Sequence, residues 1–535
     1  MILNKKIWSK VSLMYGLVVL FNVACTDTFK DYNTNKHEAT EEMMSYDNLK
    51  TGSFFTQMLR NVVLFDDGKN LSSDYQIAQG LSSDFYSGYT APTGDWNNRN
   101  HNGSYNFVTG WLEMTFKSGF TGIMPAWQSI VKIAEEQDLP EIAAIATIVK
   151  VEAMHRVADT YGPIPYINFG SGNLKNDYDA LEDVYKKFFE ELDNAIDALT
   201  NYALSNPKIL EKFDYIYAGD AVKWVKFANT LRLRLAMRVV YAAPALAQAE
   251  AEKSISNSIG VITEISEQAS LKHTSNLTYF HPLYEIAYNF NGGEVRMNAS
   301  MDVYMNGYND PRREAYFTPA SSGYHGVRLG VTANIMDNYK NGTYISNLNM
   351  DKSSTKIIWM TAAESYFLRA EGALRGWAMN GNARDLYERG IAVSFEENGV
   401  QGVSNYITNS ASVPSSFVDN AVGSSNNYAA PSNITIAWNS SGVLEENLER
   451  IITQKWIAMF PDGPEGWAEF RRTGYPKLLP VVTNNSNGTI DTNIQIRRLP
   501  YPQSEYQNNS DGVASGVSKL GGADNGGTRL WWDKK

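Results

Sequence analysis

The sequence predicts a mostly α-helical fold in which antiparallel helix pairs carry long loop excursions. Segments with helical periodicity recur along the 535 residues, and short turns join several of them in pairs. Between these pairs lie two long segments without sustained periodicity, 259–350 and 399–441, the second of which is rich in Ser and Asn. A stack of helices decorated by large loops is the architecture that fits this pattern.

The segment 142–166 is expected to be the central helix, ending in a stiff turn. Its apolar residues fall into two helical series that cover two faces, namely Ile142, Ala146, Val149, Ala153 and Val157, and Ile145, Ile148, Val151 and Met154. Such a helix has no wide polar side, so other helices must cover it. Gly162 can adopt a left-handed cap, and Pro163 and Pro165 cannot continue a helix.

The other expected helices follow the same logic, each with an apolar face at helical spacing. They span residues 51–65, 121–136, 181–199 and 221–241, a hairpin of 360–377 and 383–396, and 444–460 turning at 461–464 into 465–472. The 181–199 segment has the cleanest amphipathic pattern. The pairs have no strict sequence period, which is typical of degenerate tetratricopeptide-like repeats.

Three arginines interrupt the apolar face of 221–241. Arg232, Arg234 and Arg238 lie among leucines on this helix. We expect them to pair with carboxylates where helices meet, and an anion site is the alternative.

The segment 66–105 is predicted to be a long ordered loop with short helical fragments. It is rich in Asn, Ser and Gly but also carries many aromatic residues, which argue against disorder.

The charge balance argues against nucleic acid as a partner. The chain has 47 basic and 58 acidic residues, a net charge of -11. Without residues 1–24, which contain Lys5, Lys6 and Lys10 and no acid, 44 basic residues remain against 58 acidic ones, or -14. No cluster of Lys and Arg offers a face for phosphates.

The N-terminus is predicted to direct export and lipid anchoring. Basic residues precede an apolar run, 11–24, that is too short to span a bilayer, as in a secretory signal. Cys25, the only cysteine, follows directly and resembles the diacylglycerol acceptor of bacterial lipoproteins; a plain secreted protein is the alternative. We therefore expect a signal peptide at 1–24, a lipid-anchored tether at 25–50 and one domain at 51–535.

No catalytic, cofactor or metal motif stands out. The sequence lacks a His-Glu-x-x-His segment, a Gly-x-Ser-x-Gly segment and a phosphate loop. Asp31, Asn33, Asn35 and Glu42 have calcium-loop spacing, but Lys36 stands where that loop needs glycine. We expect no cofactor and no metal, whereas the expectation of no enzyme activity comes from the family resemblance that other motifs of the chain carry. A carboxylate pair for glycoside hydrolysis is defined only by three-dimensional spacing, so a surface glycoside hydrolase stays as an alternative.

Several motifs in a fixed order give the chain a family resemblance. They are 158–166 (ADTYGPIPY), 224–234 (WVKFANTLRLR), 309–312 (NDPR), 364–371 (ESYFLRAE), 466–476 (GWAEFRRTGYP), 497–502 (RRLPYP) and 531–533 (WWD). With these motifs the chain resembles the SusD/RagB-type nutrient-binding outer-membrane lipoproteins of Bacteroidetes.

The resemblance implies both a fold and a role. Tetratricopeptide-like helix pairs would form one side of a SusD-like α-α superhelix, and the loop excursions would form a ligand face. The protein would sit on the cell surface by its lipid anchor at Cys25. It would bind oligosaccharide, or alternatively peptide, for a SusC-like TonB-dependent transporter.

Two stretches have the composition expected of a saccharide site, since sugar rings stack on aromatic side chains and hydroxyls bind to amides and charged groups. The candidate ligand-binding residues are Trp96 and Asn97 in the first stretch, Tyr288, Phe290, Asn291 and Arg296 in the second, and, as weaker candidates, Tyr324 and Arg328. Packing beneath the loops is the alternative for each aromatic residue. In contrast, Trp224, Trp377 and Trp467 accompany helical motifs and are expected in the core.

Overall fold

The computed structural model describes residues 48–68, 71–94, 96, 100–172, 176–205, 208–275, 277–331 and 337–535. It divides into two compact units, Met1–Thr51 and Gly52–Lys535. The first contributes only residues 48–51 to the described part, including the start of helix α4 (Leu49–Val62). The predicted signal peptide and Cys25 lie outside the described residues. Within the described part, no helix has both the length and the apolar character needed to cross a bilayer.

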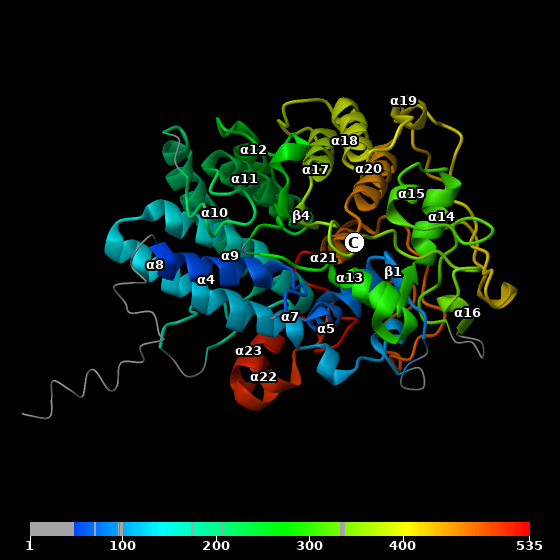
Figure 1. The fold of residues 1–535 in the computed structure, drawn as a ribbon, viewed down its shortest axis with the longest axis horizontal. Helices are drawn as coiled ribbons and strands as arrows, with labels where there is room; N and C mark the ends of the chain where they lie inside the picture. Colours follow the sequence, from blue (N-terminus) through cyan, green and yellow to red (C-terminus); the bar gives the residue numbers. More distant parts are fainter. Residues whose placement is uncertain are drawn as a thin grey trace, which may run out of the picture. The chain divides into compact units, whose positions relative to one another are not determined.

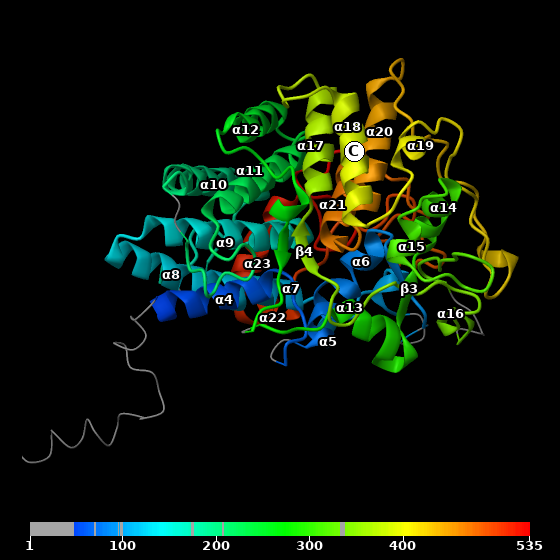
Figure 2. The same cartoon turned by 45° about the horizontal axis from the view of Figure 1, so that its top comes forward.

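A row of antiparallel helices forms one side of the second unit (Figure 1). Each of its members packs on the next: α8 (Met124–Gln137), α9 (Pro140–Tyr161), α10 (Leu181–Ala203), α11 (Ala221–Arg238) and α12 (Pro244–Ser256). Helix α11 also packs on α17 (Ala362–Leu374), which lies beside α18 (Ala383–Glu397) and α20 (Leu444–Ala458) in Figure 2. Helix α21 (Gly463–Thr473) follows α20 and contacts α9 and α11. We call these helices the helical layer, and they confirm the predicted mostly α-helical fold.

Helix α9 is buried on all sides over most of its length, as its two apolar faces predict. Every residue from Ile148 to Tyr161 is buried. Its end differs in one detail from the expected left-handed cap. Gly162 has φ 94° and ψ -127°, a conformation open to glycine but outside the left-handed helical region. A Cβ atom here would also lie 2.9 Å from Leu520 Cδ2, so the C-terminal segment packs directly on this turn.

The segment 360–377 is only partly helical, contrary to prediction. Ile357–Met360 form strand β4, and Thr361 caps α17 by accepting a hydrogen bond from the Glu364 backbone N–H at 3.0 Å. Because α17 ends at Leu374, Trp377 falls in the following turn and is only half-buried. Its predicted core position is wrong, whereas Trp224 and Trp467 are fully buried as expected.

The arginines of α11 pair with carboxylates at helix seams, which confirms that prediction. The Arg234 guanidinium donates to both oxygens of Glu364 on α17, at 2.8 and 2.6 Å. Arg238 pairs with Glu465 on α21, and Arg232 pairs with Asp193 on α10.

The remaining segments form a second layer of short elements, which we call the loop layer. Its helices are α5 (Ser72–Tyr75), α6 (Ser83–Tyr86), α7 (Met114–Lys117), α13 (Pro282–Tyr284), α14 (Ala299–Gly307), α15 (Arg313–Tyr316), α16 (Asp337–Lys340) and α19 (Val403–Ile407). Within the described residues the strands are β1 (Thr90–Pro92), β2 (Ala269–Leu271), β3 (Val295–Met297) and β4, paired antiparallel as β1–β3 and β2–β4. Two C-terminal helices, α22 (Gln503–Asn508) and α23 (Ser510–Leu520), complete the unit.

Candidate functional site

A two-stranded ribbon brings the two predicted ligand stretches to one place. Strands β1 and β3 pair with Ala91 opposite Arg296 and Pro92 opposite Val295. The pairing continues beyond the strands, because the Thr93 backbone N–H donates to the Glu294 carbonyl at 2.9 Å. The loop that follows β1 and contains Trp96 therefore leaves from the same end of the ribbon as the segment 284–294 that precedes β3. This end of the ribbon, with both loops, is the candidate ligand site.

Trp96 belongs to a small aromatic group at the surface. Its half-buried ring lies 5.4 Å from the ring of His101 and 6.2 Å from that of Trp111, nearly perpendicular to the latter at 86°. Asn100 is exposed beside this group and accepts a hydrogen bond from the Asn106 side chain at 2.9 Å. Partly open indoles next to amides are the combination that saccharides need. Asn97, the other candidate in this loop, lies outside the described residues.

The second loop presents one open aromatic ring and buries another. Phe290 is 44% exposed, so its ring is available to a ligand. Tyr288 is half-buried, stacks on Tyr284 with a ring separation of 4.8 Å, and its hydroxyl donates to the Leu348 carbonyl. Burial raises the pKa of the Tyr288 hydroxyl. Of these two candidates, Phe290 has the more accessible position.

Asn291 shapes the tip of this loop. It adopts a left-handed conformation with φ 49° and ψ 31°, which asparagine tolerates better than most residues. Its side chain donates to Glu294, and its carbonyl accepts from Lys340 Nζ at 2.8 Å. Asn291 thus holds the turn that presents Phe290.

Arg296 ties the loop to its surroundings through backbone carbonyls. Its guanidinium donates to the carbonyls of Ala287, Val295 and Lys340, each at 2.8 Å. The side chain is buried, and burial lowers the pKa of the guanidinium to about 10. In this geometry Arg296 supports the shape of the site from beneath it.

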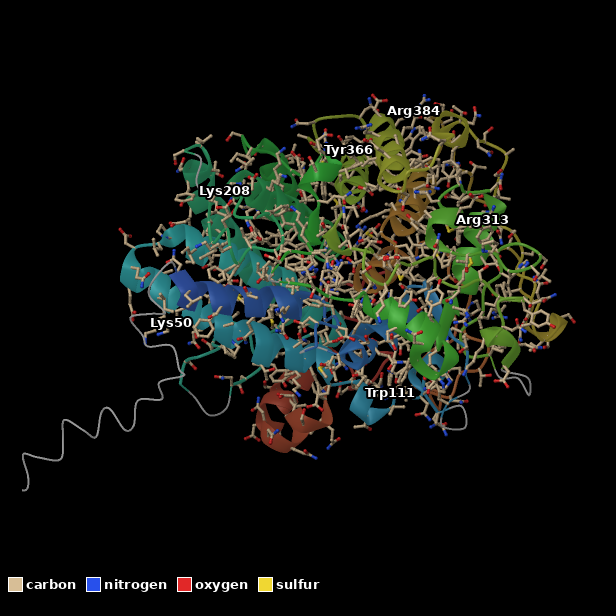
Figure 3. The ribbon with its side chains drawn as sticks, in the orientation of Figure 1. Lys50, Trp111, Lys208, Arg313, Tyr366 and Arg384 are labelled. Carbon is tan, nitrogen blue, oxygen red and sulfur yellow. The ribbon has the colours of Figure 1, made fainter. Side chains whose placement is uncertain are left out.

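Tyr324 does not join the other candidates. The segment around it pairs with the far end of β3, because the Val327 backbone N–H donates to the Met297 carbonyl at 2.8 Å. The Arg313 guanidinium covers the Tyr324 ring at 4.4 Å from its centroid. Figure 3 shows Arg313 far from Trp111, the neighbour of Trp96. Arg328, the other weak candidate, donates to the carbonyls of Asn426 and Pro480 at 3.1 and 2.7 Å.

The structure adds aromatic residues that the sequence analysis did not select. Trp111, labelled in Figure 3, contacts Trp96 with a ring separation of 6.2 Å. Its only sequence signal is an isolated indole after Thr109 and Gly110. Tyr344 is 36% exposed in the segment that lies alongside β3, where the Met297 backbone N–H donates to the Ser346 carbonyl at 3.2 Å. Both residues lie near the ribbon only because of contacts between distant parts of the chain.

Comparison with known proteins identifies the family. A family model described as SusD-like, SusD and RagB outer membrane lipoprotein, matches residues 31–533. No curated protein matches the sequence. Among solved structures, a chitin-binding SusD homologue from Flavobacterium johnsoniae is 40% identical with a TM-score of 0.86, covering 91% of this chain and 99% of its own.

Two homologues from the genus Bacteroides are similar to nearly the same extent. A SusD homologue from Bacteroides uniformis ATCC 8492 is 38% identical with a TM-score of 0.85, covering 91% of this chain and all (100%) of its own. One from Bacteroides vulgatus ATCC 8482 has the same identity of 38% and TM-score of 0.85, covering 92% of this chain and 99% of its own. These matches confirm the resemblance seen in the motifs, and the chain belongs to the SusD-like family of SusD and RagB outer-membrane lipoproteins.

Proposed function

We propose that this protein is a lipid-anchored, cell-surface binding protein that captures oligosaccharide and delivers it to a SusC-like TonB-dependent transporter in the outer membrane. The observation that carries the proposal is the ribbon β1–β3, which places the open ring of Phe290 and the Trp96–Trp111 group on loops that leave from the same end. In this proposal residues 1–24 are the signal peptide, Cys25 carries the lipid anchor, and residues 25–50 form the tether to the folded domain.

Binding without cleavage fits the arrangement of charges at the candidate site. Glu294 is buried, and its two carboxylate oxygens accept hydrogen bonds from Gln76 and Asn291. A hydrolase needs a second carboxylate within about 5 to 10 Å of the first, on the other side of the scissile bond. In the described parts of the two loops, the other carboxylate is Glu285, which accepts a hydrogen bond from Asn289 at 2.7 Å. Amide side chains bind both carboxylates, so we infer a structural role for these two groups and a binding role for the loops.

The ligand class is tested by calorimetry on the mature protein with a panel of oligosaccharides and peptides. Chito-oligosaccharides come first, because the Flavobacterium johnsoniae homologue is described as chitin-binding. We expect one oligosaccharide class to bind and to be recovered uncleaved. Binding of peptides alone would replace oligosaccharide by peptide in the proposal, and release of shorter sugars would overturn the binding-only role.

The transporter partner is tested separately by affinity purification of the full-length protein from detergent-solubilised outer membranes. We expect a TonB-dependent transporter to co-purify with it. A Cys25→Ser variant, which cannot be acylated, should leave the membrane fraction. Recovery of the full-length protein alone would contradict the partnership.

A further inference from the structure

A large cavity lies in the helical layer, far from the candidate ligand site. It has a volume of about 810 Å³, which is within the range of small-molecule sites. Helices α8, α9 and α10 form its walls, together with residues 166–169. In both Figure 1 and Figure 2 these helices lie at the opposite end of the unit from α16. No residue of the two candidate loops lines this cavity.

Small side chains keep the three helices from filling this space. The wall carries alanines from every helix, namely Ala134 on α8, Ala143 and Ala144 on α9, and Ala195 and Ala198 on α10. An alanine leaves room that a larger apolar residue would occupy in a packed interior. The cavity is therefore a consequence of residue choice on three separate helices.

A buried ion pair holds a carboxylate at the cavity. The Lys150 side chain is 2% exposed, and its Nζ lies 2.8 Å from Glu191 Oε1. The Tyr166 hydroxyl donates to the other oxygen of Glu191. Because one partner holds each oxygen, the carboxylate is fixed in place and keeps further lone pairs for a ligand. The Glu191 side chain is 11% exposed, so a ligand in the cavity has access to it.

Aromatic rings surround this ion pair. Lys150 Nζ lies 3.5 Å from the ring centroid of Trp127 and 4.7 Å from that of Tyr166. The Trp127 indole N–H donates to Thr147 Oγ1 at 3.0 Å, which fixes the ring. The half-buried Phe169 also lines the cavity, which is open to solvent. Rigid ring surfaces beside a fixed carboxylate suit a ligand with C–H faces and hydroxyl donors.

The charges around the cavity nearly cancel. Three carboxylates, Glu135, Asp138 and Glu191, stand against the ammonium groups of Lys150 and Lys187. A strongly charged ligand of either sign would gain little from this balance. The lining favours a neutral ligand that offers several hydroxyl groups.

We propose that this cavity is a second saccharide-binding site, separate from the loop site. Trp127 and Phe169 would pack against sugar C–H groups, and Glu191 and the exposed amide of Asn194 would bind hydroxyls. The ligand class rests on the proposed function, but the site itself rests on the cavity and the Lys150–Glu191 pair. Two sites on one protein raise the avidity for a long polysaccharide, provided that one chain reaches both.

The test impairs each site separately and measures how many hexasaccharide molecules one protein molecule binds. Ala198→Trp fills the cavity from an exposed position of α10, and Asn194→Trp is a second blocking variant on the same helix. Ala249→Trp, at an exposed position of α12 that does not line the cavity, is the matched control. Trp96→Ala weakens the loop site. Thermal melts establish that each variant is folded, and calorimetry with N-acetylchitohexaose, cellohexaose and maltohexaose gives the stoichiometry.

We expect the unmodified protein and Ala249→Trp to bind two molecules of one hexasaccharide. Ala198→Trp and Asn194→Trp should each remove one binding event, and Trp96→Ala should remove the other. A single event that Trp96→Ala abolishes and Ala198→Trp leaves unchanged overturns the second site while the proposed function stands. If the unmodified protein binds one hexasaccharide and only the blocking variants lose it, the cavity is the binding site and the loop site is overturned. Failure of all three hexasaccharides to bind the unmodified protein rejects the ligand class for both sites.

Discussion

Four buried arginines, two in each layer of this protein, bind different partners. In the helical layer, Arg234 and Arg472 bind carboxylates, Glu364 for the first and Glu371 for the second. In the loop layer, Arg296 and Arg328 donate to backbone carbonyls. The backbone explains the difference. Helix carbonyls already accept hydrogen bonds within the helix, whereas many loop carbonyls lack a partner until a side chain provides one.

The comparison extends to the carboxylates. Glu371 in α17 is buried against Arg472 and Arg375; burial alone would raise its pKa, but the two guanidinium groups lower the pKa to about 2. Asp302 in α14 is equally buried but accepts from the Gly326 backbone N–H and from Asn306. Burial dominates there and raises the pKa of Asp302 to about 7. Glu371 thus keeps its charge beside two guanidinium groups, whereas Asp302 has a backbone N–H and an amide as its hydrogen-bond donors.

Removal of an arginine from the helical layer should have the largest effect. Arg472 is fully buried and binds both oxygens of Glu371 at 2.7 Å, as well as Glu469. Arg472→Ala removes the cation that bridges these two buried carboxylates, and we expect the free energy of unfolding to fall by about 3 to 5 kcal/mol. Urea denaturation measures it. Arg384→Ala breaks an exposed pair with Glu388 and should change stability by less than about 0.5 kcal/mol.

The pH dependence of stability should distinguish Asp302 from Glu371. An ordinary Asp has a pKa of about 3.9, so between that value and about 7 the folded state keeps the Asp302 proton that the unfolded state has lost. Stability therefore falls as the pH rises through this window, and Asp302→Asn should reduce the slope. The Glu371 contribution has the opposite sign, because it is present above the ordinary Glu pKa and is lost as the pH falls toward about 2. Unfolding curves across this pH range measure both, and an unchanged slope in Asp302→Asn would contradict the assignment.

Substitution of Arg296 should loosen the loop at 284–294 more than it destabilises the whole fold. Arg296→Lys keeps the charge but cannot reach three carbonyls with one ammonium group, so we expect the loop at 284–294 to loosen. The loss should be about 1 to 3 kcal/mol, and amide hydrogen exchange should be faster in this loop. Lys340→Met, which removes a single hydrogen bond to the Asn291 carbonyl, is the milder control. Equal exchange rates in Arg296→Lys and the unmodified protein would show that the loop does not depend on this side chain.

The helical layer was largely predictable because its signals are local. The periodicity of α9 and α10 and the arginines of α11 can be recognised within single segments of about 20 residues. Elements of either layer were missed or misplaced where the local sequence signal was weak or misleading. Helix α14 is nine residues long and buried nearly throughout, so it has no polar face to mark it. Trp377 has an apolar side chain but falls beyond the end of α17.

The candidate site was predictable in composition but not in arrangement. Trp96 and Phe290 were selected as aromatic residues among amides, yet β1 and β3 are three residues each and pair across about 200 residues of sequence. Such short strands have no recognisable alternation. The same limitation concealed the contact of Trp111 with Trp96 and the use of Arg296 as a backbone tie. These features depend on which segments meet in space.

Trp96→Ala should have the smallest effect on stability and a clear effect on binding. The half-buried Trp96 ring contacts His101 and Trp111 at the edge of the loop layer. We expect the melting temperature to change no more than after a surface substitution, while affinity for the bound oligosaccharide falls at least about tenfold, or about 1.4 kcal/mol.

Trp111→Ala tests the neighbouring ring and should also weaken binding. Unchanged affinity in both variants would exclude this aromatic group from the site and leave Phe290 as the exposed ring to test next. A fall in both stability and affinity would instead mean that the two indoles support their loop, as Arg296 supports the segment 284–294.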